Sequence, residues 1–125
     1  MGMIRAAILS LIAVQTAAAE DRPQVLLCGG VEPFWSLELT SEAALYTDPD
    51  TGEIDYTIPD ERIAEGRHWP RVMTLLAARD TAIAVLRPAA CSDTMSDRSL
   101  DWSIDLLTQR RGEAVVYTGC CRAPD

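Results

Sequence analysis

The four cysteines of this chain are its residues with the most definite chemistry. Cys120 and Cys121 are adjacent, and neighbouring residues of a β-strand point to opposite faces, so the pair needs two different partners. Four cysteines allow three pairings; strand geometry disfavours Cys120–Cys121, and of the two pairings left we prefer Cys91–Cys120 together with Cys28–Cys121. Neither the Cys-x-x-Cys spacing of redox pairs nor the two-to-four-residue spacing of zinc ligands occurs. We therefore predict two structural disulfides and no metal site.

A second group of candidates begins with the string Glu32-Pro33-Phe34-Trp35. Pro33 fixes its own φ and favours an extended conformation for the residue before it. Phe34 and Trp35 should then point to opposite faces of a strand. We expect one ring to plug the end of the fold and the other to cover the rim or to contact a ligand.

Glu32 lies between apolar neighbours, where a carboxylate is buried only if it is paired. Arg98 and Arg122 are the candidate partners. The pair would be either a structural ion pair or a polar group at the floor of a binding pocket. Both interpretations stay open at this stage.

The third candidate is the string 93–97, Asp-Thr-Met-Ser-Asp. Its two carboxylates supply part of a calcium site, which needs six to eight oxygen ligands. Capping of backbone amides by Asp93 and Ser96 explains the same residues without a metal. Met95 would pack inward or serve as a soft contact residue. Taken together, the sequence predicts a binding site composed of Glu32, Phe34, Trp35, Asp93, Met95, Asp97 and Arg122.

Catalysis has little support in the sequence. There is no Gly-x-Ser-x-Gly elbow, phosphate-binding glycine loop or zinc-protease helix. His68 is the only histidine and has no obvious nucleophile near it in the sequence. We predict no cofactor and no catalytic residue, with a hydrolase kept as the alternative.

Period-two alternation predicts the strands that would position these residues. Leu100, Trp102, Ile104 and Leu106 alternate with polar residues, which is typical of a half-buried strand. Similar patterns predict about eight short strands, at 24–28, 35–40, 45–47, 54–58, 72–78, 82–86, 100–106 and 114–119. The expected fold is all-β, a small antiparallel barrel or sandwich stapled by disulfides. One buried helix over 72–86, and short helical turns near 60–66 or 92–99, are the alternatives.

The first 19 residues resemble a cleavable export signal. Arg5 is followed by an apolar run over 6–14 and by small residues before Glu20. The run is too short to span a bilayer. We predict cleavage after Ala19, a single β domain over 20–125 and a periplasmic or secreted location, without stable membrane insertion.

Charge narrows the range of partners. Nineteen acidic residues outweigh eleven basic ones, giving a formal net charge of −8. Such a surface disfavours nucleic acid and anionic membranes. The acidic surface is compatible with a basic protein partner or a cation. It is equally explained by the need to keep a small exported protein soluble.

The Glu-Pro-Phe-Trp string, the Cys-x-Asp-x-Met-Ser-Asp loop and the terminal Gly119-Cys120 together resemble a family of small uncharacterised exported bacterial proteins. In style the chain is also similar to small periplasmic β-domains such as META domains and lysozyme-inhibitor barrels, although fold does not fix function. The resulting hypothesis is an exported barrel that binds an unidentified small ligand or cell-envelope protein without catalysis. An envelope structural or stress-protective protein, whose motifs serve only folding, is the alternative.

Overall fold

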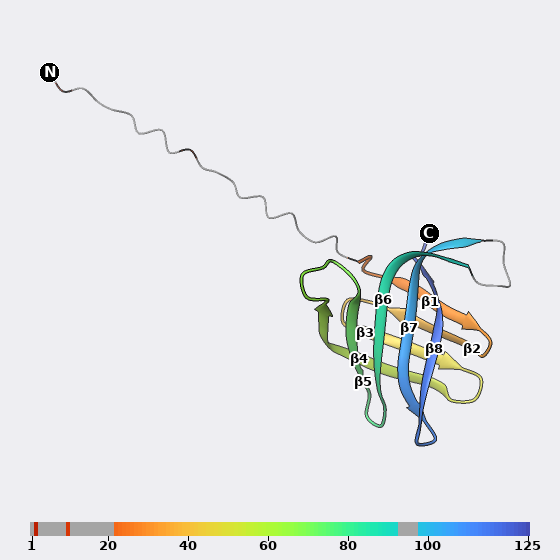
Figure 1. Cartoon of the computed structure of the whole chain (residues 1–125). Helices are drawn as coiled ribbons and strands as arrows, with labels where there is room; N and C mark the ends of the chain where they lie inside the picture. The colour runs from red at the N-terminus through yellow and green to blue at the C-terminus, as the bar shows by residue number, and fades with distance from the viewer. Residues whose placement is uncertain (1, 3–9, 11–21, 93–97) are drawn as a thin grey trace.

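The computed structural model describes residues 2, 10, 22–92 and 98–125, and their regular structure is entirely β. Eight antiparallel strands form a closed barrel in which each strand pairs with the next and the last pairs with the first (Figure 1). The strands are β1 (Leu26–Val31), β2 (Phe34–Leu39), β3 (Ala43–Asp48), β4 (Gly52–Ile63), β5 (Arg71–Leu76), β6 (Thr81–Ser92), β7 (Ser99–Arg110) and β8 (Glu113–Arg122). The predicted all-β fold is confirmed, as a barrel rather than a sandwich.

The helical alternatives are wrong wherever the structure describes them. Residues 72–86 form β5 and β6, because Met73 and Leu75 point inward while Val72 and Thr74 alternate with them. The expected helical turn near 60–66 is occupied by β4, and most of 92–99 lies outside the described residues. In the part of the chain that the structure describes, no helix is long and apolar enough to cross a membrane.

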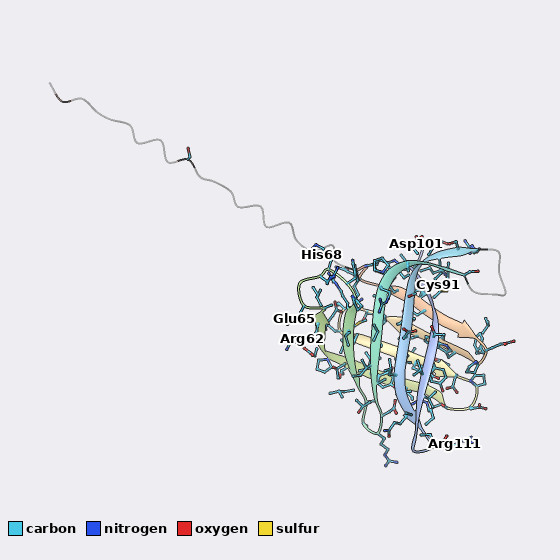
Figure 2. All side chains as sticks on the ribbon, viewed as in Figure 1. Arg62, Glu65, His68, Cys91, Asp101 and Arg111 are labelled. Atoms are coloured by element: carbon cyan, nitrogen blue, oxygen red, sulfur yellow. A yellow bond between two sulfur atoms is a disulfide. The ribbon has the colours of Figure 1, made fainter. Side chains whose placement is uncertain are left out.

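The up-and-down order gives the barrel two distinct ends. We call the end that carries the turns at 32–33, 49–51, 77–80 and 111–112 the hairpin end. The opposite, terminal end carries the start of β1, the end of β8 and the connections at 40–42 and 64–70. In Figure 2, Arg111 marks the hairpin end, and His68 and Glu65 mark the terminal end.

Turn chemistry fixes the tight hairpins of the hairpin end. Arg111 and Gly112 both have positive φ, 54° and 78°, which is the conformation of a two-residue turn that matches strand twist. Gly52, with φ 79°, ends the three-residue turn that follows Asp48. The Asp48 carboxylate accepts hydrogen bonds from the amides of Asp50 and Thr51, at 2.8 and 2.5 Å. Local sequence therefore determines where β4 and β8 begin.

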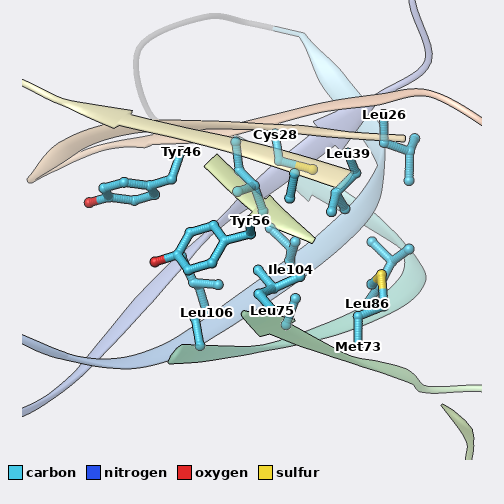
Figure 3. Close-up of a cluster of buried hydrophobic side chains, with 14 of the residues drawn as sticks. Leu26, Cys28, Leu39, Tyr46, Tyr56, Met73, Leu75, Leu86, Ile104 and Leu106 are labelled. Carbon is cyan, nitrogen blue, oxygen red and sulfur yellow. The ribbon is translucent and has the colours of Figure 1, made fainter. Parts of the chain in front are cut away.

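The barrel interior is filled by side chains. Inward positions of all eight strands contribute fully or almost fully buried apolar residues, among them Leu26, Leu37, Leu39, Tyr46, Tyr56, Met73, Leu75, Leu86, Ile104 and Leu106. Figure 3 shows most of these residues packed into one cluster. The hydroxyls of Tyr46 and Tyr56 point away from the aliphatic part of that cluster.

The seam between β1 and β8 depends on glycines that face Trp35. A Cβ on Gly30 would lie 2.5 Å from the Trp35 Nε1 atom, and one on Gly119 would lie 2.9 Å from its Cζ2. The Cβ built on Gly119 would also lie 2.1 Å from the carbonyl oxygen of Gly29. These glycines are needed because the indole ring occupies the space where their side chains would be. Much of the Gly-Gly and Gly-Cys-Cys pattern is therefore explained by barrel closure.

Both disulfides form as predicted, one on each face of β8. Cys28–Cys121 joins β1 to β8 inside the barrel, and Cys91–Cys120 joins β6 to β8 outside it. They span 93 and 29 residues. Chain-entropy arguments give upper stabilisations of about 4.7 and about 3.6 kcal/mol. The two disulfides are compatible with an oxidising, exported compartment.

Candidate binding site at the hairpin end of the barrel

The structure does not bring the sequence-predicted site residues together. Glu32 and Phe34 lie in the β1–β2 hairpin, and Trp35 is buried inside the barrel. Arg122 pairs with Leu27 near the start of β1. It is therefore separated from Glu32 by roughly 16 Å along the strand, at about 3.3 Å per residue. Asp93, Met95 and Asp97 lie outside the described residues.

The expectation of a buried, paired Glu32 is wrong. Its side chain is exposed, and among the described residues no ion pair reaches it. The apolar neighbours that suggested burial sit at a hairpin turn, where Phe34 is itself 61% exposed. Phe34 and Trp35 do face opposite ways, with Trp35 inside and Phe34 at the rim.

A different group of polar residues lies where two strands separate. β4 pairs with β5 only from Thr57 onward, opposite Leu76, so residues 52–56 extend beyond the end of β5. Side chains bridge the resulting gap. The Tyr56 hydroxyl donates a hydrogen bond to the Asp80 carboxylate. Arg110 Nη1 donates to both oxygens of the same carboxylate, at 3.2 and 3.3 Å.

Arg110 is the centre of this group. Its Nη1 also donates to Thr108 Oγ1 at 3.1 Å and to the carbonyl oxygen of Gln109 at 2.9 Å. The guanidinium lies 5.0 Å from the ring centre of Tyr46 and 5.9 Å from that of Tyr117, within cation–π range. Burial opposes the charge of Arg110, but the nearby Tyr56 and Tyr46 hydroxyls and the Asp80 carboxylate outweigh this effect and raise the pKa of Arg110. Its Nε and Nη2 atoms are buried, and no acceptor among the described residues meets hydrogen-bond geometry with them. Buried donors without acceptors are rare and costly, so these two nitrogens are the unused hydrogen-bonding capacity of the cluster.

An aromatic layer supports Arg110 from inside the barrel. Trp35 stacks on Tyr46 with ring centres 6.4 Å apart and tilts against Tyr117 at 5.9 Å. The Tyr46 hydroxyl donates to Asp48 Oδ2 at 2.5 Å. Trp35 therefore contributes to the hairpin end as its internal support and is not exposed to a ligand.

The electrostatics keep both buried tyrosines protonated. Burial raises the pKa of Tyr46 above its ordinary value, and the hydrogen bond to Asp48 raises it further. Burial likewise raises the pKa of Tyr56, and the hydrogen bond to Asp80 adds to the effect. Burial alone would raise the pKa of Asp48, but hydrogen bonds from Tyr46 and from the Thr51 and Asp50 amides outweigh it and lower the pKa.

An open hollow of about 1180 Å³ lies beside this cluster. One wall is the start of β4, where Glu53 and Asp55 are exposed. The facing wall consists of the β5–β6 and β7–β8 hairpins, which carry Arg79, Arg110 and Arg111. It also presents Ile83 and Leu107, which are partly exposed and pair directly across the two strands. The hollow therefore combines an acidic wall with a basic and apolar one.

Apolar alternation alone does not reveal this cluster, because its members are polar residues on the inner faces of strands and in a turn. Inward positions of β7 continue from Leu106 through Thr108 to Arg110, so period-two counting places an arginine on the inner face. A basic residue at an inward-facing position of a strand therefore indicates a candidate polar site inside the barrel. Its partner Asp80 could not be found in this way, since it lies 30 residues earlier in a turn.

Metal and nucleophile chemistry has no support in the described residues. They contain no group of three or more His, Cys, Asp or Glu side chains placed to hold a metal ion. All four cysteines are in disulfides. His68 is exposed in the β4–β5 connection at the terminal end, away from the hollow. What the hairpin end can do chemically is accept hydrogen-bonding and charged groups.

A scan against protein-family models, a search of curated proteins and a search of solved structures each found no match. The resemblance to a family of small exported bacterial proteins therefore stays a prediction.

Proposed function

We propose that this protein is an exported, disulfide-stapled barrel that binds a cell-envelope partner at its hairpin end, without catalysis. One observation carries the proposal. Arg110 keeps two buried nitrogens, Nε and Nη2, without acceptors among the described residues, beside an open hollow. A partner that supplied carbonyl or carboxylate oxygens there would satisfy donors that the fold leaves unused.

The filled interior directs the proposal towards the rim. Barrels that carry a small ligand inside keep a cavity there, whereas this barrel places Trp35, Tyr46 and the aliphatic cluster along its axis. A partner that contacts the hairpins from outside fits this packing better than a small ligand enclosed by the barrel.

A purely structural or stress-protective role is the second candidate. It is favoured by the glycine pattern around Trp35, because Gly30 and Gly119 serve barrel closure. On this interpretation the family-like strings maintain the fold and the hairpin end has no partner.

Site-specific photo-crosslinking in the producing cell separates the two candidates. A photoreactive amino acid replaces Ala78, which lines the hollow and is exposed. In the matched control it replaces Glu65, which is exposed at the terminal end. The same substitutions are repeated in an Arg110→Met background, with circular dichroism and non-reducing gels to show an intact fold.

The proposal predicts discrete crosslinked products from position 78, few from position 65, and a loss at 78 when Arg110 is replaced. Equal crosslinking at both positions, or no product at either, contradicts it and favours the structural role. Crosslinking at position 78 that is unchanged by the Arg110→Met substitution also contradicts the proposal. In that case the partner would not use the proposed donors of Arg110.

A further inference from the structure

The hydrogen-bond ladder closes the barrel but leaves parts of several strands paired on one side only, and one of these open edges lines the hollow. Residues 52–56 of β4 pair with β3 on one side, and β5 begins pairing only at Thr57. After Leu76 the chain turns away, with the Ala77 amide bonded to the Asp80 carbonyl oxygen. Every second residue of this segment thus directs its N–H and C=O groups into the hollow without a strand partner.

From this edge we infer that the partner contributes an extended segment, which adds to β4 as an extra strand. The inference rests on the proposed function and names the chemistry of its partner. The five residues that extend beyond β5 give roughly 16 Å of edge at about 3.3 Å per residue. Main-chain hydrogen bonds supply affinity in such strand addition, and the alternating side chains supply specificity.

The charges of the edge select the occupant. Glu53 and Asp55 alternate with Ile54, so both carboxylates share the outer face of β4 while Ile54 faces inward. Residues directly opposite them on an added strand are favoured when basic. The residue opposite Ile54 would point into the hollow towards Ala77 and Ala82, where an apolar side chain fits. The expected segment alternates basic and apolar residues.

A second copy of this chain is a poor occupant. Pairing two β4 edges would bring the Glu53 and Asp55 carboxylates of one copy close to those of the other, and like charges placed opposite one another are destabilising. Charged residues on a free edge are a recognised way of preventing self-association. The same charges leave the edge open to a basic strand.

The test uses short synthetic peptides and the purified, oxidised protein. A fluorescent peptide that alternates valine with arginine is titrated against the protein, and a peptide with glutamate in place of arginine is the comparison. Two further versions of the arginine peptide are N-methylated at alternate residues, one in each register. Amide exchange of residues 52–56 is followed by NMR with and without peptide.

The expected result has three parts. The arginine peptide binds and slows exchange of alternate amides in 52–56, and the glutamate peptide binds more weakly. One N-methylated register loses roughly tenfold or more in affinity, since each lost backbone hydrogen bond costs roughly fivefold. The other register, whose N–H groups face away from β4, binds far better.

Charge reversal tests the selection of a basic strand. The double variant Glu53→Arg and Asp55→Arg should invert the preference between the arginine and glutamate peptides. Glu42→Arg with Glu65→Arg makes the same change in net charge at the terminal end and should leave the preference unchanged. If both double variants behave alike, binding follows net charge and the inference is wrong.

No peptide binding, binding without protection of 52–56, or equal tolerance of both N-methylated registers would each overturn strand addition. These failures are distinguishable from failure of the proposed function. If position 78 still crosslinks a partner in an Arg110-dependent manner, the hairpin end binds its partner by another mode.

Discussion

The two ends of the barrel are closed by the same combination, arginine packed on aromatic rings, but the arginines differ in exposure. At the terminal end, Arg22 Nε lies 2.8 Å from Glu61 Oε1, and Arg71 Nη1 lies 3.5 Å from Glu61 Oε2. Arg22 also donates to the carbonyl oxygen of Thr40 at 2.8 Å. The side chains of Arg22 and Arg71 are only 5% and 4% exposed, against 17% for Arg110.

Tryptophans complete the terminal end. Arg71 lies 4.8 Å from the Trp69 ring centre, and Trp69 meets Trp102 edge-on at 5.1 Å. There the sheet ladder continues, with Ile63 paired to Arg71. At the hairpin end the ladder stops short and side chains bridge the gap. The comparison shows that an arginine cluster can be almost fully buried at one end of a barrel and partly exposed beside an open hollow at the other.

The largest difference between the two ends is expected in unfolding free energy when a tryptophan is replaced, Trp35 at the hairpin end or Trp69 at the terminal end. Trp35→Ala removes a ring that is 2% exposed and supports the hairpin end, so we expect a loss of about 3–5 kcal/mol in unfolding free energy. Trp69→Ala removes a partly exposed ring and should cost about 1–2 kcal/mol. Urea unfolding followed by circular dichroism measures both. Equal losses would show that Trp35 has no special role in supporting its end.

Removing the carboxylate of each end should give the next largest effect. Glu61→Gln deprives two buried arginines of a shared anion, so we expect a loss of about 2–3 kcal/mol. Asp80→Asn should cost about 1 kcal/mol, because Arg110 keeps its contacts to Thr108, Gln109 and the tyrosine rings. Urea unfolding at neutral pH measures both.

Asp60→Asn is the control for these charge removals. Its ion pair with Arg62 is exposed, and exposed pairs contribute below about 1 kcal/mol. If Asp80→Asn proves as costly as Glu61→Gln, the hairpin end is as firmly closed as the terminal end, and the contrast between the ends fails.

Alkaline pH should weaken the hairpin end selectively. The folded-state pKa values of Tyr46 and Tyr56 are raised, so their contribution to stability is full below the unfolded pKa of about 10 and is lost as pH rises above it. The expected loss is about 1 kcal/mol for each tyrosine between about pH 10 and about pH 11. Tyr46→Phe with Tyr56→Phe should flatten this dependence.

Tyrosinate absorbance checks the same prediction directly. Of the three tyrosines, two should ionise only together with unfolding. Full ionisation near the ordinary tyrosine pKa while far-ultraviolet circular dichroism stays native would rule out the proposed protonation of Tyr46 and Tyr56.

Glu32→Gln should have the smallest effect on stability. The side chain is exposed and unpaired among the described residues, so we expect a change within about 0.5 kcal/mol. Chemical denaturation of matched samples measures it. A loss above about 2 kcal/mol would instead support the ion pair predicted from the sequence.

The strand segments were predictable because they depend on local alternation, and the preferred disulfide pairing was predictable from four cysteines of which two are adjacent. Alternation identified the segments, and the adjacency of Cys120 and Cys121 required one bond on each face of the last strand. The extra length of β4 was not predictable: the register shift between Thr57 and Asp60 lets it reach Ile63 through Pro59. Such an irregularity depends on the neighbouring strand and leaves no periodic signal.

The candidate site was less predictable than the fold. Glu32 was judged from its apolar neighbours, but those neighbours sit on a turn where burial rules for strands do not apply. Hydrogen bonds link Tyr56 of β4 through Asp80 of the β5–β6 turn to Arg110 at the end of β7. These three segments meet only because the barrel closes. A single sequence shows the residue types but not which hairpin tips converge.

The β1–β8 seam also has a consequence for the order of events during synthesis. The first strand finds its second neighbour only in Glu113–Arg122, the last strand of the chain. Contacts of such long sequence separation form late, because the intervening chain must first be brought together. Until those ten residues are available, β1 and β7 each keep an open edge. The chain therefore cannot complete its ladder until those ten residues have been synthesised, and up to that point it can form only an open sheet.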